Sequence, residues 1–344
     1  MNLMGIRSKR RFLDRLGDLS NGALRLHTPD GEIHEFGQGH PFGDMQLHDW
    51  SALTPNSLSK TYAAGLWSSS SLPRLSTLFV SNPKIFGSNK SLEPLSAIGN
   101  AEPGNEFFQL LLDPGMNHTS ALFGDGIADL EQAQQEKYDH ILNQLTPGFR
   151  LLDVNCGWGG LAERATERGF FVTGLTHSAA QKGYADARLD GLADIRRQEL
   201  SAEADTYDNI VAIETLNRIS PRMRLSFFSD LKLRLAQNGR IIMQAVITPE
   251  TNSVQRPDVP TTSLLLNLID QSGLRVQESF DFGTSYATTF RLWHEQMKKN
   301  YHRLVHMGYD DVYQREWQFA LNTTAALFET GQTNVMQLEL AHKL

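Results

Sequence analysis

The chain has 344 residues, of which 40% are hydrophobic and 21% charged, and its formal net charge is −7 at pH 7. This composition is ordinary for a globular protein with a large core, and the negative charge argues against a nucleic-acid partner. The single cysteine, Cys156, excludes an internal disulfide framework and a cysteine zinc cluster, and it fits the reducing cytoplasm. No stretch approaches the roughly 20 apolar residues of a membrane-spanning helix, so we expect a cytoplasmic protein whose membrane contact, if any, is peripheral.

Residues 1–80 predict a small N-terminal α+β domain, which we interpret as an accessory domain. Basic and apolar side chains alternate over residues 1–19 with the spacing of an amphipathic helix. Such a helix suits either packing within the N-terminal domain or a basic foot on the inner face of the membrane. The elements predicted next are a hairpin, a strand and helical pieces broken at two prolines: residues 23–28 with 32–36, residues 45–48, and residues 50–80 with breaks at Pro55 and Pro73.

Residues 81–100 are rich in Asn, Ser, Pro and Gly and lack periodicity, so they predict a linker before a larger domain over residues 101–344. Apolar spacing predicts helices at 106–112 and 129–145. Strand and helix patterns then alternate: strands 151–154, 170–175, 195–198, 209–213 and 239–246, and helices 161–168, 178–190 and 221–236. This order is typical of a mostly parallel, doubly wound α/β sheet, which binds ligands at the carboxyl ends of its strands.

The last part of the larger domain predicts a helical segment between strands. The elements are a helix at 263–269, a strand at 275–281, a long helical run at 289–327 that breaks near 308–310, and an edge strand at 335–342.

The stretch LLDVNCGWGGLAERAT, residues 151–166, is the most informative part of the chain. An apolar strand opens through a turn of small residues into a helix, which brings backbone N–H groups and a positive helix end towards a ligand. The spacing D-x-N-x-G-x-G differs from the glycine-rich motifs of dinucleotide folds and phosphate loops. It resembles motif I of the Rossmann-like S-adenosylmethionine methyltransferases. Asn155 replaces a motif glycine, and because Asn tolerates left-handed backbone, we expect the turn to be kept.

Over nearly its whole length the sequence resembles the cyclopropane-fatty-acyl-phospholipid synthase family. The segments that carry the resemblance are GALRLHTPDGEIHEFG with LHDW, GNEFFQLLLDPGMNHTSALF, LLDVNCGWGGLA with GLTHSAAQ, FGTSYATTFRLWHEQM, and GYDDVYQREWQFAL. The resemblance implies a class I methyltransferase core with a C-terminal helical segment. It also implies an activity in lipid biosynthesis: a methyl group passes from S-adenosylmethionine to the double bond of an unsaturated acyl phospholipid, and proton loss closes a three-membered ring.

The resemblance assigns the S-adenosylmethionine site to motif I and to the neighbouring strand ends. The residues concerned are Asp153, Asn155, Cys156, Gly157, Gly159, Leu175, Thr176, Gln181, Gln198 and Glu199. Glu199 stands where the family presents an acid near the adenine, and a solvated acidic turn is the alternative. We interpret Cys156 as a packed side chain rather than a nucleophile, and no metal site is predicted.

The resemblance further implies a bound bicarbonate as proton acceptor, yet most of the residues expected to hold it are replaced. The family's Cys, Glu and two His fall on Ser120, Asn217, Arg218 and Gln244, and its Tyr is kept as Tyr286. A different Tyr of the family, in the segment before GN, is replaced by Ala101. Glu214 is a candidate substitute for the missing acid if its loop shifts. His118 and His294 are alternative bases, although a lone His in an apolar run is more often a buried structural residue.

Three hypotheses for the function follow from these replacements. The first is an S-adenosylmethionine-dependent C-methyltransferase that acts on an unsaturated acyl lipid or a similar apolar alkene at the membrane surface. The second is a catalytically lapsed paralogue, a pseudoenzyme that binds lipid or S-adenosylmethionine, or that is the structural partner of an active synthase. The third is methylation without ring closure, which needs no strong base. The resemblance is also compatible with a homodimer.

Overall fold

The computed structural model describes residues 3–53, 58–86, 103–145, 149–250 and 259–343. The chain divides into two compact units, and each consists of two segments of the sequence. The first unit comprises residues 1–102 and 287–331, and the second comprises residues 103–286 and 332–344. Residues 287–331, which the sequence analysis placed in the larger domain, therefore belong to the N-terminal unit. Most of the predicted linker lies outside the described residues.

The first unit contains a four-stranded sheet with the order β2-β1-β3-β4. Its strands are β1 (Gly22–His27), β2 (Ile33–Gln38), β3 (Phe42–Leu47) and β4 (Trp67–Ser68). Strands β1 and β2 form the predicted antiparallel hairpin, and β3 runs parallel to β1. The helices of this unit are α1 (Leu3–Leu16), η1 (Trp50–Leu53), α2 (Leu58–Ala63), α3 (Leu72–Ser81), α4 (Pro83–Phe86), most of α11 (Gly283–Lys299), α12 (Tyr301–His306) and α13 (Asp311–Glu329).

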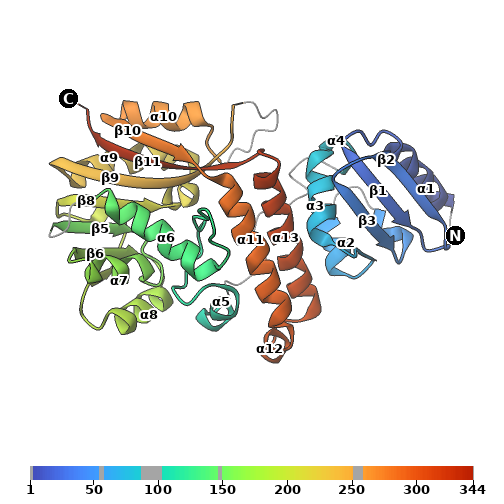
Figure 1. Cartoon of the computed structure of the whole chain (residues 1–344), viewed down its shortest axis with the longest axis horizontal. Helices are drawn as coiled ribbons and strands as arrows, with labels where there is room; N and C mark the ends of the chain where they lie inside the picture. Colours follow the sequence, from blue (N-terminus) through green and yellow to red (C-terminus); the bar gives the residue numbers. More distant parts are fainter. Residues whose placement is uncertain (1–2, 54–57, 87–102, 146–148, 251–258, 344) are drawn as a thin grey trace. The chain divides into compact units, whose positions relative to one another are not determined.

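The core of the first unit joins its two segments of sequence. Trp67 is fully buried and its ring contacts Phe79 of α3 and Phe319 of α13, at centroid distances of 5.9 and 6.1 Å; α3 lies beside α13 in Figure 1. Phe12 and Leu16 of the predicted amphipathic helix α1 belong to the same core, so this helix packs within its unit. Pro73 lies in the first turn of α3, where proline is tolerated, and Pro55 lies outside the described residues.

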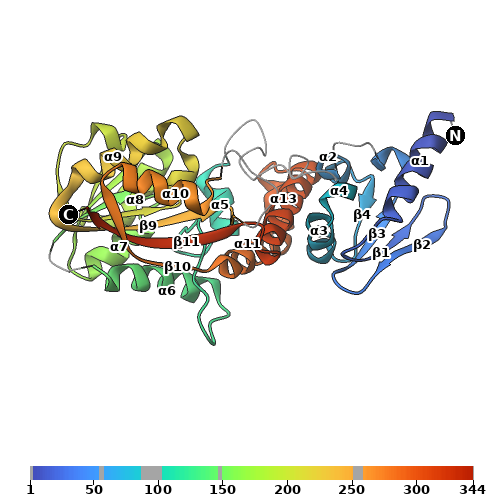
Figure 2. The ribbon, with the colours of Figure 1, turned by 90° about the horizontal axis from the view of Figure 1, so that it is seen from above.

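The second unit contains a seven-stranded sheet with the order β10-β11-β9-β8-β5-β6-β7. Its strands are β5 (Arg150–Val154), β6 (Phe171–Thr176), β7 (Asp194–Arg197), β8 (Tyr207–Ile213), β9 (Leu235–Ile247), β10 (Leu274–Asp281) and β11 (Asn334–His342). Strands β5 to β9 are parallel, whereas β11 is antiparallel to both of its neighbours. Figure 2 shows β11 beside β9 and β10. The predicted doubly wound, mostly parallel α/β class is confirmed.

Helices cover both faces of this sheet. The helices and short 3₁₀ turns of the unit are α5 (Asn105–Leu111), α6 (Leu130–Asn143), α7 (Gly160–Glu167), α8 (Ala179–Leu189), η4 (Leu200–Ala202), η5 (Thr215–Arg218), η6 (Pro221–Met223), α9 (Arg224–Arg234) and α10 (Thr262–Gln271). One apolar core packs α6, α7 and α8 against the sheet, and a second core packs α9 and α10 against it. Among the described residues, no helix is both long and apolar enough to cross a membrane.

Two details of the sheet differ from the prediction. Strand β11 was predicted at an edge, but it lies between β10 and β9, and β10 is the edge strand. The alternating pattern of residues 335–342 reports which face of the strand is buried, whereas the position of a strand depends on partners elsewhere in the chain. The strand predicted at 239–246 begins earlier, because β9 starts at Leu235, and Asn238 and Gly239 lie inside it, close to a register shift in its pairing with β8. An Asn-Gly pair is a common turn signal, but here the strand continues through an irregularity in its pairing.

Candidate active site

The turn between β5 and α7 forms a cradle at the carboxyl end of the sheet. Asn155, Gly157 and Gly159 have φ values of +65°, +56° and +84°. The left-handed conformation that was predicted for Asn155 is confirmed. At Gly159 a Cβ atom would lie 3.1 Å from the Cβ of Ala185 in α8, so close helix packing and the backbone conformation both require glycine. The turn thereby places the N-terminal end of α7 at the carboxyl ends of the parallel strands.

Hydrogen bonds tie this turn to the neighbouring strand ends. The Cys156 amide donates to the carbonyl oxygen of Leu175 at 2.8 Å, and the Thr215 hydroxyl donates to the carbonyl oxygen of Val154 at 3.0 Å. The Cys156 side chain is buried, and burial raises the pKa of its thiol, so it is a neutral packing group at physiological pH. The ends of β5, β6 and β8 therefore form one rigid platform.

Two cavities meet at Asn155. The first has a volume of about 60 Å³, and its walls include Asp153, Cys156, Gly157 and Gln181. The second has a volume of about 110 Å³, and its walls include Leu175, His177, Gln198 and Glu199. Most of the predicted cofactor residues thus line one cavity or the other. Of the remaining two, Gly159 packs against α8, and the Thr176 hydroxyl contacts the Gln181 side-chain oxygen at 2.9 Å.

Asp153 supplies an unsatisfied carboxylate to the first cavity. Its side chain is 3% exposed, and Oδ2 has no hydrogen-bond partner among the described residues. Burial raises the pKa of Asp153 to about 7, and the positive charge of Lys137 opposes this shift. A buried acceptor without a donor is costly, so this oxygen suits a ligand that carries an N–H donor or a positive charge.

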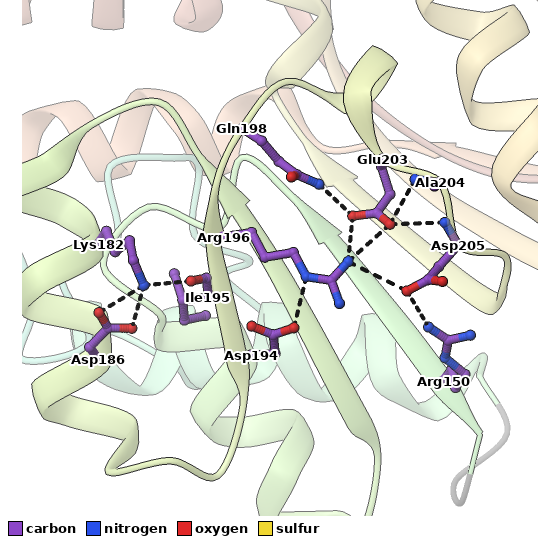
Figure 3. Close-up of polar contacts among 10 residues, drawn as sticks. All are labelled: Arg150, Lys182, Asp186, Asp194, Ile195, Arg196, Gln198, Glu203, Ala204 and Asp205. Carbon is purple, nitrogen blue, oxygen red and sulfur yellow. Dashed lines mark hydrogen bonds and ion pairs between the residues drawn. The ribbon is translucent and has the colours of Figure 1, made fainter.

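Gln198, in the wall of the second cavity, belongs to an ion-pair network centred on the buried carboxylate of Glu203, which Figure 3 shows. Glu203 is 2% exposed, and its carboxylate accepts hydrogen bonds from Arg196 Nη1 at 3.0 and 2.9 Å and from the Gln198 amide at 2.6 Å. The network therefore fixes the side chain of Gln198. Glu199 is exposed and pairs with Nδ1 of His177 at 3.1 Å, so its carboxylate is a solvated group at the rim of the cavity.

A second set of predicted residues converges on Glu214, immediately after β8. The Glu214 Oε1 atom accepts hydrogen bonds from the Ser120 backbone N–H at 2.9 Å and from the Gln244 amide at 2.8 Å. The Oε2 atom accepts one from the Tyr286 hydroxyl at 2.8 Å. Four distant segments of the chain therefore meet at one carboxylate, which is 9% exposed. We call these four residues the Glu214 cluster.

Lys137 is a functional candidate that the sequence analysis missed. Its side chain is fully buried, and Nζ donates to the Thr119 hydroxyl at 2.8 Å and to the Gln134 side-chain oxygen at 2.6 Å. Burial lowers the pKa of Lys137 to about 8, and the negative charges of Glu214 and of two aspartates oppose the shift. A signal was present, because Gln134 and Lys137 occupy positions of the apolar stripe of α6, three residues apart.

Three other predicted residues lie outside the Glu214 cluster. Asn217 donates to the carbonyl oxygen of Val246 at 2.8 Å and accepts from its amide at 2.9 Å. His118 is half-buried in the wall of the first cavity, where its ring contacts Phe108, and desolvation lowers its pKa to about 3, so it is a weak base. His294 belongs to the other compact unit, where its ring lies 3.0 Å from the Asn322 amide.

Two of the positions predicted from the resemblance remain. Arg218 lines the first cavity, and Ala101 lies outside the described residues.

The residues present do not fit the bicarbonate that the resemblance implies. The Ser120 amide, the Gln244 amide and the Tyr286 hydroxyl all donate to the Glu214 carboxylate. A dissolved anion would compete with that carboxylate for these donors, and the two negative charges would repel each other in a buried setting. We therefore derive no step through bicarbonate.

The seven-stranded sheet, with its ligand cradle after the first parallel strand, defines a class I methyltransferase fold. The sequence profile described as "Mycolic acid cyclopropane synthetase" matches residues 100–338. The chain therefore belongs to the mycolic acid cyclopropane synthetase family, whose members are S-adenosylmethionine-dependent methyltransferases and cyclopropane synthases. The family predicted from the sequence is confirmed.

Curated relatives cover nearly the whole chain. The cyclopropane-fatty-acyl-phospholipid synthase of Escherichia coli (strain K12) is 27% identical over 350 residues, which span 95% of this chain and 91% of that protein. The tuberculostearic acid methyltransferase UfaA1 of Mycobacterium tuberculosis is 24% identical over 367 residues, with 92% and 83% covered.

Solved structures share the fold. The cyclopropane synthase MmaA2 from Mycobacterium tuberculosis matches with a TM-score of 0.65 and 24% identity, over 69% of this chain and 94% of that one. The mycolic acid cyclopropane synthase CmaA1, solved with SAH and CTAB, matches with a TM-score of 0.64 and 23% identity over the same shares of the two chains, 69% and 94%.

Proposed function

We propose that this chain is an S-adenosylmethionine-dependent C-methyltransferase that acts on the double bond of an unsaturated acyl phospholipid or a similar apolar alkene. The observation that carries the proposal is the left-handed turn at Asn155, Gly157 and Gly159, beside the unsatisfied carboxylate of Asp153. Membership of a family of S-adenosylmethionine-dependent methyltransferases supports this assignment.

The residues around the two cavities suit the parts of S-adenosylmethionine. Asp153 would accept a hydrogen bond from its ammonium group, which would satisfy the buried oxygen and favour the ionised carboxylate. Backbone N–H groups at the start of α7 would attract its carboxylate. The cavity beside Leu175 and Gln198 would hold the adenosine, and apolar residues such as Phe227 in its wall suit a flat ring.

S-adenosylmethionine supplies an electrophilic methyl group in such a reaction. Because an alkene is a weak nucleophile, the protein must hold its double bond close to that methyl group and must exclude water from the resulting cation. The subsequent loss of a proton requires a base within hydrogen-bond reach.

Peripheral contact with the membrane surface follows from a substrate that is part of a phospholipid. Arg10, Arg11 and Arg15 of α1 are exposed, while the apolar face of this helix is buried in its own unit. These arginines suit electrostatic attraction to anionic headgroups rather than insertion of the helix.

Two measurements test the proposed function. Calorimetric titration should show that the chain binds S-adenosylmethionine, and expression in a host without its own synthase should add one methylene unit to unsaturated phospholipid chains, seen by mass spectrometry. The variant Glu167→Gln is a matched control, because Glu167 is exposed at the far end of α7, the helix that follows the turn at residues 155–159. Absence of cofactor binding would refute the proposal.

The non-catalytic alternative has its own supporting observation. Both polar atoms of the Asn217 side chain bond the backbone of Val246, so this residue cannot replace the acid of the family motif. Cofactor binding with unchanged lipids in the same experiment would favour a lapsed paralogue or a structural partner of an active synthase. A methylated but uncyclised product would instead select methylation without ring closure.

A further inference from the structure

We infer that the Glu214 carboxylate is the built-in proton acceptor of the reaction centre and that it takes the place of a dissolved anion. This inference rests on the proposed function, since it names the group that removes the proton after methyl transfer. Ser120, Gln244 and Tyr286 all donate hydrogen bonds to the Glu214 carboxylate. The inference follows from this arrangement, because these donors are then not free to hold bicarbonate.

The backbone at Glu214 indicates that a carboxylate at this point has a role other than folding. Its φ is +55°, a left-handed conformation that is unfavourable for a residue with a side chain and that glycine adopts freely. The Glu214 amide donates to the carbonyl oxygen of Gln244 at 2.7 Å, which holds this conformation. Strained residues of this kind cluster at active sites, where surrounding contacts maintain them.

The hydrogen bonds leave the carboxylate able to accept a proton. Oε1 accepts from two donors, whereas Oε2 accepts only from the Tyr286 hydroxyl among the described residues. One of the two acceptor positions on Oε2 therefore remains. Ile213 and Thr119, the residues that precede Glu214 and Ser120, line the first cavity. Glu214 therefore directly follows, in the sequence, a wall residue of the cavity that Asp153 also lines.

The electrostatic setting suits a base. Burial raises the pKa of Glu214, while its three donors and the nearby charge of Lys137 oppose this shift. A raised pKa increases the affinity of the ionised form for a proton, and a general base works best when its pKa approaches the working pH. Lys137 is buried and compensates this charge within the same unit.

The proposed step balances in atoms and electrons. The alkene π pair forms a bond to the methyl carbon, the carbon–sulfur bond breaks, and its electron pair stays on sulfur. The substrate then carries a positive charge on the second alkene carbon. Glu214 Oε2 takes a proton from the added methyl group, and the electron pair of that C–H bond forms the bond that closes the ring. The neutral acid afterwards releases its proton to solvent.

Two substitutions at the same position test the inference. Glu214→Gly removes the carboxylate where glycine suits the backbone, so this variant should fold, and it leaves the Ser120, Gln244 and Tyr286 donors for a small anion. Ring closure should fall by about 10²-fold or more and should recover when bicarbonate or formate is added. Glu214→Gln should lose ring closure to a similar extent without recovery, because its side chain still fills the site. The wild-type rate should not change when bicarbonate is removed.

Three results would overturn the inference: a wild-type protein that requires bicarbonate, a Glu214→Gly variant that closes rings at full rate without an added anion, or equal recovery of both variants. The surface variant Glu167→Gln should match the wild type throughout.

A binding measurement separates this inference from the proposed function. Formate is titrated calorimetrically into the wild type and into Glu214→Gly, without lipid. Binding to the variant alone supports the claim that Glu214 occupies an anion's place, even if no lipid product is ever found and the proposed function fails. Absence of formate binding to Glu214→Gly, or equal binding to the wild type, would refute that claim.

Discussion

Asp153→Asn should stabilise the protein in the absence of cofactor, although it removes a residue of the proposed cofactor site. The wild-type carboxyl is 3% exposed, and burial raises its pKa from 3.8 to about 7. A shift of about three units corresponds to roughly 4 kcal/mol, which is the most that ionisation of this group can cost the folded state. The asparagine side chain has nearly the same shape and carries no charge, so it avoids this cost.

The sign of the pH dependence follows from the raised pKa. Because the folded state holds its proton up to about pH 7 and the unfolded state loses it near pH 4, wild-type stability falls as pH rises between these values. Below the unfolded pKa the wild type and Asp153→Asn should be equally stable. At pH 8 the variant should be more stable by about 2–4 kcal/mol, and at pH 5 by less than half of that.

Urea-induced unfolding at pH 5 and pH 8 measures this difference. Asp139→Asn is a matched control with the opposite sign, because the hydrogen bond from Arg164 lowers the pKa of Asp139. That variant should lose stability at pH 8, and the loss should fade as pH falls through the lowered folded pKa. Added S-adenosylmethionine should stabilise the wild type more than Asp153→Asn. An Asp153→Asn variant no more stable than the wild type at pH 8 would show that the reasoning about this carboxylate is wrong.

Three further substitutions test the turn at Asn155 and the ion-pair network around Glu203. Asn155→Gly should leave stability unchanged or raise it by up to about 1 kcal/mol, whereas Asn155→Val should lower it by about 2 kcal/mol, because the backbone at this residue is left-handed. Equal effects of both substitutions in chemical denaturation would contradict this. Glu203→Ala should lower the free energy of unfolding by about 2 kcal/mol and weaken cofactor binding through Gln198, because it removes the buried acceptor of Arg196, of the Gln198 amide and of the Ala204 backbone N–H. A loss below about 1 kcal/mol would argue that solvent replaces the carboxylate.

The local parts of the fold and of the site could be predicted from the sequence. Helix α6 begins after Asp129, whose side chain accepts from the Gln132 amide at 3.1 Å, and the apolar spacing that follows predicts the helix itself. The conformation of Asn155 follows from its place in a turn and from the tolerance of Asn for that conformation. Such features depend on residues a few positions apart, so the sequence pattern contains them.

The non-local parts could not be predicted. The position of β11 inside the sheet depends on pairing with strands about 60 and 95 residues earlier, as in the Phe280–Gln337 and Ile241–Leu340 pairs. The role of Glu214 depends on donors that lie 94, 30 and 72 residues away in sequence. The place of Lys137 on the apolar stripe of α6 indicates that it is buried, but the carboxylates that oppose the lowering of its pKa come from distant parts of the chain.

The interleaving of the two units has a consequence for the order in which the chain folds during synthesis. Strand β11 pairs with β10 and β9, and residues 287–331 of the other unit are made between β10 and β11. The large sheet therefore remains incomplete until residue 342 has been synthesised. Until then, β11 does not cover the edges of β9 and β10 with which it later pairs. Because the loop must close before its contacts form, pairing of β11 should be a late step in the folding of the sheet.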